Sequence, residues 1–274
     1  MDEELRLLPN AALPDGAPTP ELTDTQHLDI YGLGALRAAV VIETKNDKHV
    51  VKSVWMSSQD PSLARQLVSV IKDRYLSPDK GLLFHASASQ PALREELKGS
   101  TIRSQIMSKT VDADVKLPDN ISYRDMTADE ARDYFQDFEE MFVKLMLTYK
   151  TAVENDEDVK QRGHAMVRSI APNGVETPGH RFIIVEEAGV TLATLWVGER
   201  GEKQSFCYNI EVLPEKRRQG YGRKTLLVWE HAAASMRAST LGLTVFGTNE
   251  AGLRLYNGGG FEADDTTFTF SWAE

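Results

Sequence analysis

The chain has 274 residues, 41% of them hydrophobic, so it is long enough for one large domain or two modest ones with real cores. Its 41 acidic and 31 basic residues give a formal charge of -10, which argues against nucleic acid or an anionic membrane as a general partner. The single cysteine, Cys207, excludes an internal disulfide framework. No stretch is typical of a signal peptide or a membrane span, so we expect a cytoplasmic protein, either a monomer or a homodimer.

The first half opens with a proline-rich arm. Residues 1–27 contain four prolines and few large apolar side chains, which predicts an extended or poorly ordered segment. The polar residues 111–119 form the predicted domain boundary. Between these two segments, periodicity predicts a β-hairpin, a helix, a strand, a short helix and a strand, at Ala35–Glu43 with His49–Met56, Pro61–Tyr75, Gly81–Ala86, Pro91–Lys98 and Thr101–Thr110.

The second half alternates strands and helices. A capping signature at Thr127–Glu130 starts the first of two helices, at about 127–149 and 154–170. Ala188-Gly189 predicts a tight hairpin. The predicted strands are Ile121–Asp125, Phe182–Glu187, Val190–Gly198, Phe206–Leu213, Leu243–Phe246 and Phe261–Trp272, with one helix after a basic turn and another at Asn249–Tyr256.

That basic turn lies in Asn209–Lys224, which reads NIEVLPEKRRQGYGRK. Five positive charges stand at the start of a helix, where the helix dipole favours anions instead. Two glycines allow a close backbone approach and leave N–H groups free, as in helix starts that hold phosphate. The segment therefore predicts an anion site.

A family resemblance follows from this turn and the residues after it. The run Arg217-Arg-Gln-Gly-Tyr-Gly, then Asn249-Glu-Ala-Gly-Leu-Arg-Leu-Tyr256 and Gly260-Phe261, resembles the GCN5-related N-acetyltransferase (GNAT) superfamily over about residues 119–272. The resemblance implies an α/β fold of the α+β type, with a mixed, mostly antiparallel sheet flanked by helices. We expect an arm at 1–27, a first domain at 28–115 and a catalytic domain at 119–274.

The first half resembles a degenerate copy of the same fold. An offset of 160 residues aligns Leu93 with Leu253 and Arg94 with Arg254, and the order of elements repeats. The first copy lacks the glycine pair and the basic cluster, and Glu96 stands where Tyr256 would. We therefore expect one cofactor site per chain.

The resemblance implies that the turn binds acetyl-CoA, the acyl donor. The expected cofactor-binding residues are Val212, Leu213, Arg217, Arg218, Gln219, Gly220, Tyr221, Gly222, Arg223 and Asn249. Tyr256 matches the family's tyrosine and is the candidate acid for the departing thiolate. Glu211 is the candidate base, and a water chain without a dedicated base is the alternative.

The resemblance implies an N-acetyltransferase that moves an acetyl group from acetyl-CoA to a primary amine of a small molecule or an exposed peptide, by direct attack in a ternary complex. The alternative is a non-catalytic, acyl-CoA-binding regulatory protein. A P-loop does not fit, because the turn lacks its spacing. No spacing suggests a metal site, Cys207 is expected in the core, and His164 and His180 are read as ordinary hydrogen-bonding groups.

Overall fold

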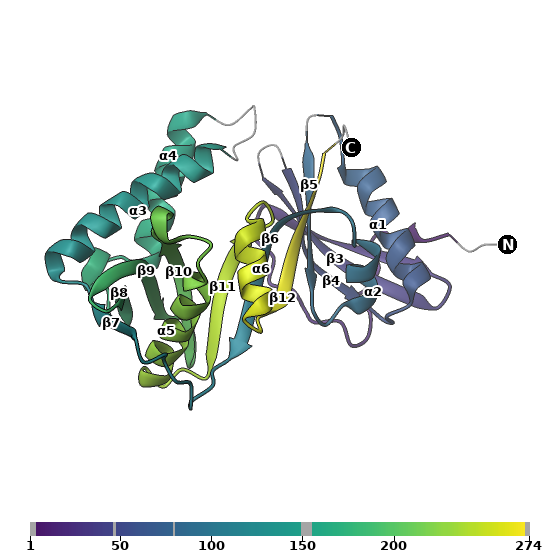
Figure 1. Cartoon of the computed structure of the whole chain (residues 1–274). Helices are drawn as coiled ribbons and strands as arrows, with labels where there is room; N and C mark the ends of the chain where they lie inside the picture. Colours follow the sequence, from purple (N-terminus) through teal and green to yellow (C-terminus); the bar gives the residue numbers. More distant parts are fainter. Residues whose placement is uncertain (1–3, 46–47, 79, 149–154, 272–274) are drawn as a thin grey trace. The chain divides into compact units, whose positions relative to one another are not determined.

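The computed structural model describes residues 4–45, 48–78, 80–148 and 155–271 (Figure 1). The chain forms two compact units. The first contains Met1–Met107, Val245–Glu250 and Ala263–Glu274, and the second contains Ser108–Thr244 and Ala251–Glu262. No helix in the described part of the chain is long and apolar enough to cross a membrane.

The first unit is a sheet with two helices. Its strands follow the order β1-β2-β3-β4-β5-β12. Helix α1 buries Leu63, Leu67 and Ile71, as its spacing predicts. The elements are β1 (Arg6–Leu7), β2 (Gln26–Leu33), β3 (Leu36–Lys45), β4 (Lys48–Met56), α1 (Pro61–Tyr75), β5 (Gly81–Ser87), α2 (Pro91–Glu96), β6 (Thr101–Thr110), which continues into the second unit, and β12 (Glu262–Phe270).

Residues 6 and 7, in the segment expected to be extended or poorly ordered, are extended and attached to this sheet. Strand β1 pairs antiparallel with β2. Leu5 is buried, and its N–H donates to Gln66 Oε1 at 2.8 Å. The Leu8 N–H donates to the Ile30 carbonyl at 2.7 Å. Leu5 thus joins the hydrophobic core, which explains why this segment is fixed.

The end of the chain also belongs to the first unit. Strand β12 pairs antiparallel with β5, with Phe268 opposite Phe84. Phe268 and Phe270 lie in the core that α1 covers. The compact units therefore differ from the predicted ranges 28–115 and 119–274, because apolar side chains at the end of the sequence complete the core of the first unit.

The second unit has the predicted order of elements. Its strands follow the order β11-β10-β9-β8-β7. Ala188 (φ 50°) and Gly189 (φ 79°) form the predicted two-residue turn. The elements are β7 (Ile121–Asp125), α3 (Ala128–Thr148), α4 (Asp156–Ile170), η1 (Gly174–Glu176), β8 (His180–Glu187), β9 (Val190–Glu199), β10 (Gln204–Val212), η2 (Pro214–Lys216), α5 (Tyr221–Ser235), β11 (Thr240–Phe246, to Thr244 in this unit) and α6 (Glu250–Gly258, from Ala251 in this unit).

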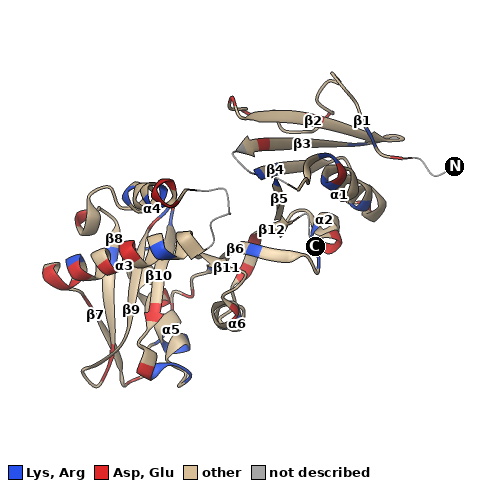
Figure 2. Cartoon of the chain, turned by 90° about the horizontal axis from the view of Figure 1, so that it is seen from above, with Lys and Arg blue, Asp and Glu red and all other residues tan. Residues whose placement is uncertain are grey.

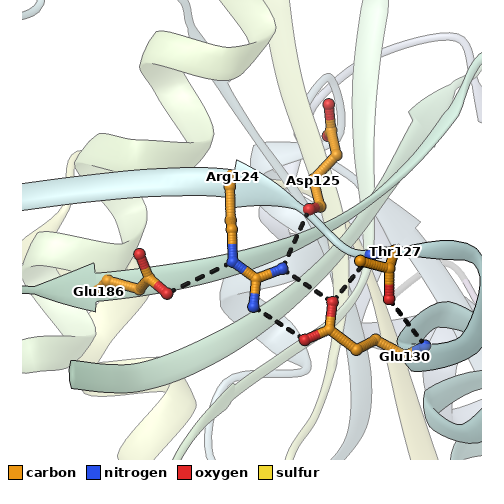
Figure 3. A network of polar contacts seen from close by, with 5 residues as sticks. All are labelled: Arg124, Asp125, Thr127, Glu130 and Glu186. Atoms are coloured by element: carbon orange, nitrogen blue, oxygen red, sulfur yellow. Dashed lines mark hydrogen bonds and ion pairs between the residues drawn. The ribbon is translucent and has the colours of Figure 1, made fainter. Parts of the chain in front are cut away.

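The predicted capping box at the start of α3 is confirmed (Figure 3). The Thr127 N–H donates to Glu130 Oε2 at 2.8 Å, and the Glu130 N–H donates to Thr127 Oγ1 at 3.3 Å. Arg124 donates to both Glu130 oxygens at 2.8 Å and pairs with Glu186 at 3.4 Å. The hydrogen bonds that Arg124 donates lower the pKa of Glu130 to about 2. Glu130 therefore remains an acceptor well into the acidic range.

Each unit contains a parallel strand pair that separates part of the way along. Strands β4 and β5, joined by α1, pair as far as Val51 and Phe84, although both strands continue. Strands β10 and β11, joined by α5, pair as far as Cys207 and Leu243 and then diverge in the same way. The other pairs whose register is described within a unit are antiparallel. The repeated arrangement agrees with the predicted second copy of one fold.

A buried carboxylate on α5 binds the end of β6 and the residues that follow it. Glu230 on α5 is 3% exposed and accepts from Lys109 Nζ at 2.8 Å and from the Asp112 N–H at 2.9 Å. We expect Glu230→Ala to lower the free energy of unfolding by about 2–4 kcal/mol, because it leaves a partly buried ammonium and an N–H without an acceptor. Urea denaturation measures this change, and a loss below about 0.5 kcal/mol contradicts it.

Candidate active site

The turn between β10 and α5 presents a row of main-chain N–H donors. Gly220 precedes α5 in a left-handed conformation (φ 84°), has no side-chain cap, and Arg218 is also left-handed (φ 59°). None of the five N–H groups from Arg218 to Gly222 has a backbone or side-chain acceptor in the described part of the chain. A β-carbon on Gly220 would meet open space. Such a row of amides at a helix start suits a phosphate group.

Arg217, expected to contact the cofactor, is bound to strand β10. Its Nε donates to the Val212 carbonyl at 3.0 Å, and its guanidinium pairs with Glu211 Oε1 at 3.0 Å. The Leu213 N–H donates to Leu192 O at 2.9 Å. The Val212 carbonyl and the Leu213 N–H thus already have protein partners, and the expected contacts of Val212 and Leu213 with the cofactor stay a prediction.

Only part of the basic cluster is unpaired. Lys224 Nζ pairs with Glu187 Oε1 at 2.8 Å, and the Tyr221 hydroxyl donates to Glu187 Oε2 at 2.7 Å. Gln219 Nε2 donates to the Glu215 carbonyl at 2.9 Å. Figure 2 shows acidic positions beside the basic ones near the start of α5. Within the described residues, the cluster's cations without a carboxylate partner are Arg218 and Arg223, since the charge of Lys216 acts on Glu187.

A β-bulge decides which side chains of β10 face helix α3. The register with β9 shifts between Cys207 and Asn209, so Tyr208 is the extra residue. Tyr208 packs against Trp196, and Asn209 Nδ2 donates to the Tyr134 hydroxyl of α3 at 2.8 Å. By alternation Glu211 lies on the same face as Asn209. The candidate base is therefore on the α3 side of the sheet.

Tyr256 lies in α6, and its hydroxyl can donate a hydrogen bond or a proton. The residue is 7% exposed, and its ring meets Phe261 edge to face at 5.8 Å between centroids. Burial raises the pKa of Tyr256, and the nearby Cys207 thiol adds to the rise. No described residue accepts from or donates to its hydroxyl. Tyr256 is thus a neutral O–H donor without a partner in the described protein.

Tyr134 is the residue that the sequence did not reveal. It stands one position before Phe135 in the apolar stripe of α3, so periodicity assigns it to the core. Burial raises the pKa of Tyr134, and Cys207 and Glu211 add to the rise, while the hydrogen bonds with Asn209 and Thr194 oppose it. The sequence did contain one sign of this contact, a tyrosine within the apolar face of a helix. A buried tyrosine hydroxyl requires a hydrogen-bond partner, so its position indicates a polar contact in the core.

Two motif residues have structural partners. Asn249 stands directly before α6, and its N–H donates to Phe246 O at 2.9 Å. By contacts Asn249 belongs to the first unit and the turn belongs to the second, so its contact with a cofactor stays a prediction. Gly260 is left-handed (φ 83°), and Phe261 stacks on Trp229 at 5.4 Å.

The equivalent positions of the first unit are filled by its own side chains. Asp60 caps α1 by accepting from the Ser62 and Leu63 N–H groups at 2.7 and 3.2 Å. Beside the diverging strands, Gln90 donates to the Val54 carbonyl and accepts from the Ser87 N–H. The Asp60 carboxylate thus satisfies N–H groups at the start of α1, whereas the N–H groups at the start of α5 have no acceptor in the described part of the chain.

A groove of about 1130 Å³ in the second unit lies away from these residues. It is bordered by α3, α4, η1 and the start of β8, and neither Tyr134, Glu211 nor Tyr256 lines it. His164 Nδ1 contacts Glu139 Oε1 at 2.8 Å, and His180 Nδ1 accepts from Trp196 Nε1 at 3.1 Å. Both groove histidines thus have protein partners, as expected.

Cys207 lies in the core, as predicted. It is buried and free, and burial raises the pKa of its thiol. A neutral buried thiol is a poor nucleophile. In the described part of the chain, no group of three or more His, Cys, Asp or Glu side chains is arranged to hold a metal ion.

The chain is similar to known acetyltransferases. The model of the acetyltransferase (GNAT) family matches residues 132–261. The uncharacterized N-acetyltransferase YycN of Bacillus subtilis is 27% identical over 118 residues, which cover 41% of this chain and 75% of YycN. The crystal structure of YycN superposes with a TM-score of 0.47 at 25% identity, over 52% of this chain and 92% of YycN.

A longer match shows the fold of most of the chain. A GCN5-related N-acetyltransferase from Sphaerobacter thermophilus is 15% identical, with a TM-score of 0.50 over 93% of this chain and 82% of that protein. The turn, the diverging strands and the tyrosine of α6 all fall within the residues that the family model matches. Residues 132–261 of the chain are therefore similar to the acetyltransferase (GNAT) family.

Proposed function

We propose that this protein is an acyl-CoA-dependent N-acetyltransferase that acts on a primary amine of a small molecule or an exposed peptide. The observation that carries the proposal is the row of unpartnered N–H groups from Arg218 to Gly222, beside strands that have diverged. These donors and the open space at Gly220 fit the diphosphate of acetyl-CoA. The capped α1 supports a single cofactor site per chain.

The chain's own residues would handle the two protons of the reaction. Acetyl-CoA, when bound, supplies a thioester that a neutral amine can attack. Transfer forms an N–C bond and breaks the C–S bond. Glu211 would take the proton that leaves the amine, and Tyr256 would give its proton to the thiolate, after which solvent returns both groups to their starting states.

A free-thiol assay with acetyl-CoA and a panel of primary amines tests this function. Amine-dependent thiol release, with the acetylated amine identified by mass spectrometry, is the expected result. If acetyl-CoA raises the melting temperature but no amine is acetylated, the non-catalytic regulatory alternative is favoured. If acetyl-CoA and other acyl-CoAs leave the melting temperature unchanged, the cofactor assignment is wrong.

The unpaired cations should contribute more to cofactor affinity than the paired one. We expect Arg218→Ala and Arg223→Ala each to weaken acetyl-CoA binding by about 5–10-fold, because they remove a cation without a carboxylate partner. Lys224→Ala should weaken binding no more than about twofold, because Glu187 already compensates that charge. Isothermal titration at constant ionic strength measures the three affinities, and equal losses would contradict the ranking.

A further inference from the structure

Three polar side chains from separate elements meet beside Glu211. Tyr134 comes from α3, Asn209 from β10 and Thr194 from β9, and Thr194 is the cross-strand partner of Glu211. The bulge at Tyr208 is what turns Asn209 toward α3. A polar group on the inner side of an amphipathic helix is costly unless it is hydrogen-bonded, and Asn209 supplies the hydrogen bond to Tyr134.

The hydrogen bonds leave one acceptor open. Asn209 Nδ2 donates to the Tyr134 oxygen at 2.8 Å, so the amide oxygen Oδ1 points away from Tyr134. No described residue donates to Oδ1. Glu211, two residues further along the same face, pairs through Oε1 with Arg217 and is about half exposed. Asn209 Oδ1 and the Glu211 carboxylate are therefore two hydrogen-bond acceptors on one face of β10.

We propose that Asn209 Oδ1 holds one N–H of the acceptor amine while Glu211 takes the other, and that Tyr134 is a positioning residue that fixes the Asn209 amide. The inference rests on the proposed function. A neutral primary amine has two N–H groups, and its lone pair must stay free for attack. One N–H bond to Oδ1 would orient the nitrogen, and the other proton would pass to Glu211 as the N–C bond forms.

The arrangement sets a specificity. A neutral secondary amine has a single N–H, which Glu211 must receive, so it leaves Asn209 Oδ1 without a donor. A site that hydrogen-bonds one group of its substrate discriminates against an analogue without that group. The site should therefore prefer primary amines over their N-methyl derivatives, and this preference should depend on Asn209 and Tyr134.

Benzylamine and N-methylbenzylamine are the probes. The thiol-release assay gives kcat/KM for both amines with wild type, Asn209→Ala, Tyr134→Phe and the double variant. Wild type should prefer benzylamine by about tenfold or more. Asn209→Ala should bring the ratio close to the steric effect of the methyl group alone, Tyr134→Phe should give an intermediate ratio, and the double variant should match Asn209→Ala.

Tyr208→Phe is the matched control, because its hydroxyl has no hydrogen-bond partner in the described part of the chain and its ring packs nearby. It should keep the wild-type ratio. A ratio unchanged in both Asn209→Ala and Tyr134→Phe overturns the inference, and if Tyr134→Phe does not fold, Asn209→Ala alone decides. Acetyl-CoA stabilisation of wild type without transfer to either probe also overturns the amine site. Absence of that stabilisation overturns the proposed function instead.

Discussion

Gly220→Asp should abolish the rise in melting temperature that acetyl-CoA gives the wild-type protein. At a ligand concentration of 100 Kd, binding contributes about 2.7 kcal/mol, which corresponds to a rise of roughly 5–10 °C for a chain of this size. The new carboxylate would stand directly before α5, where five N–H groups have no acceptor among the described residues. It would repel the diphosphate and accept those N–H groups itself.

The first unit shows what such a carboxylate does. Asp60 before α1 accepts from two N–H groups of the first turn, the arrangement that Gly220→Asp would create before α5. An N-cap carboxylate contributes about 0.5–2 kcal/mol, and the left-handed conformation at Gly220 costs an L-residue about 1–2 kcal/mol. These effects nearly cancel, so the ligand-free variant should melt within a few degrees of wild type.

Two further variants separate charge from backbone strain. Gly220→Ala adds the same strain without the charge and should keep part of the acetyl-CoA response. Gly201→Asp places an aspartate at another left-handed glycine with open space, in the loop between β9 and β10, and should keep the full response. A normal melting shift for Gly220→Asp would mean that the turn does not bind the cofactor.

The sequence predicted the second unit well because its signals are local. The capping box at Thr127 and Glu130, the hairpin at Ala188-Gly189 and the glycine turn before α5 each depend on residues a few positions apart. Alternation also placed Ile210 and Glu211 on opposite faces of β10. Which of those faces carries α3 depended on the bulge at Tyr208, and no periodicity reveals a bulge.

The first unit was harder to predict because buried polar groups interrupt its patterns. Strand β2 was missed since Asp29, 8% exposed, stands where an apolar residue is expected. Its carboxylate accepts from the Tyr31 and Tyr75 hydroxyls, and Arg74 lies 3.5 Å away. These partners are up to 46 positions distant in sequence, so nothing near Asp29 shows that its burial is compensated.

The same limit applies to long-range strand pairing and to the site. The pairing of β12 with β5 joins residues that are about 180 positions apart, and alternation alone does not name the partner of a strand. The sequence predicted the turn, Glu211 and Tyr256, which lie in or near the family motifs. It did not predict Tyr134, whose partner Asn209 is 75 residues away, or the ion pairs that occupy Arg217 and Lys224.

Tyr256→Phe should lower kcat for thiol release by about 100-fold, a typical loss for a general acid, while the Kd for acetyl-CoA stays within about twofold. The variant removes a hydroxyl that has no partner in the described protein, so no buried group loses a hydrogen bond. Its stability should therefore stay within about 0.5 kcal/mol of wild type.

The pH dependence of kcat tests whether Tyr256 stays protonated, as an acid must. Burial raises the pKa of Tyr256 above the ordinary value of about 10, so the hydroxyl keeps its proton to higher pH than an exposed tyrosine. An acid is active in its protonated form, and wild-type kcat should thus show no fall from this group between pH 7 and about 10. Tyr123→Phe, which removes a hydroxyl bound to His231 at 3.0 Å, is the control and should leave kcat unchanged. An undiminished rate for Tyr256→Phe would mean that water, and not Tyr256, protonates the thiolate. Tyr256 would then have only a packing role against Phe261.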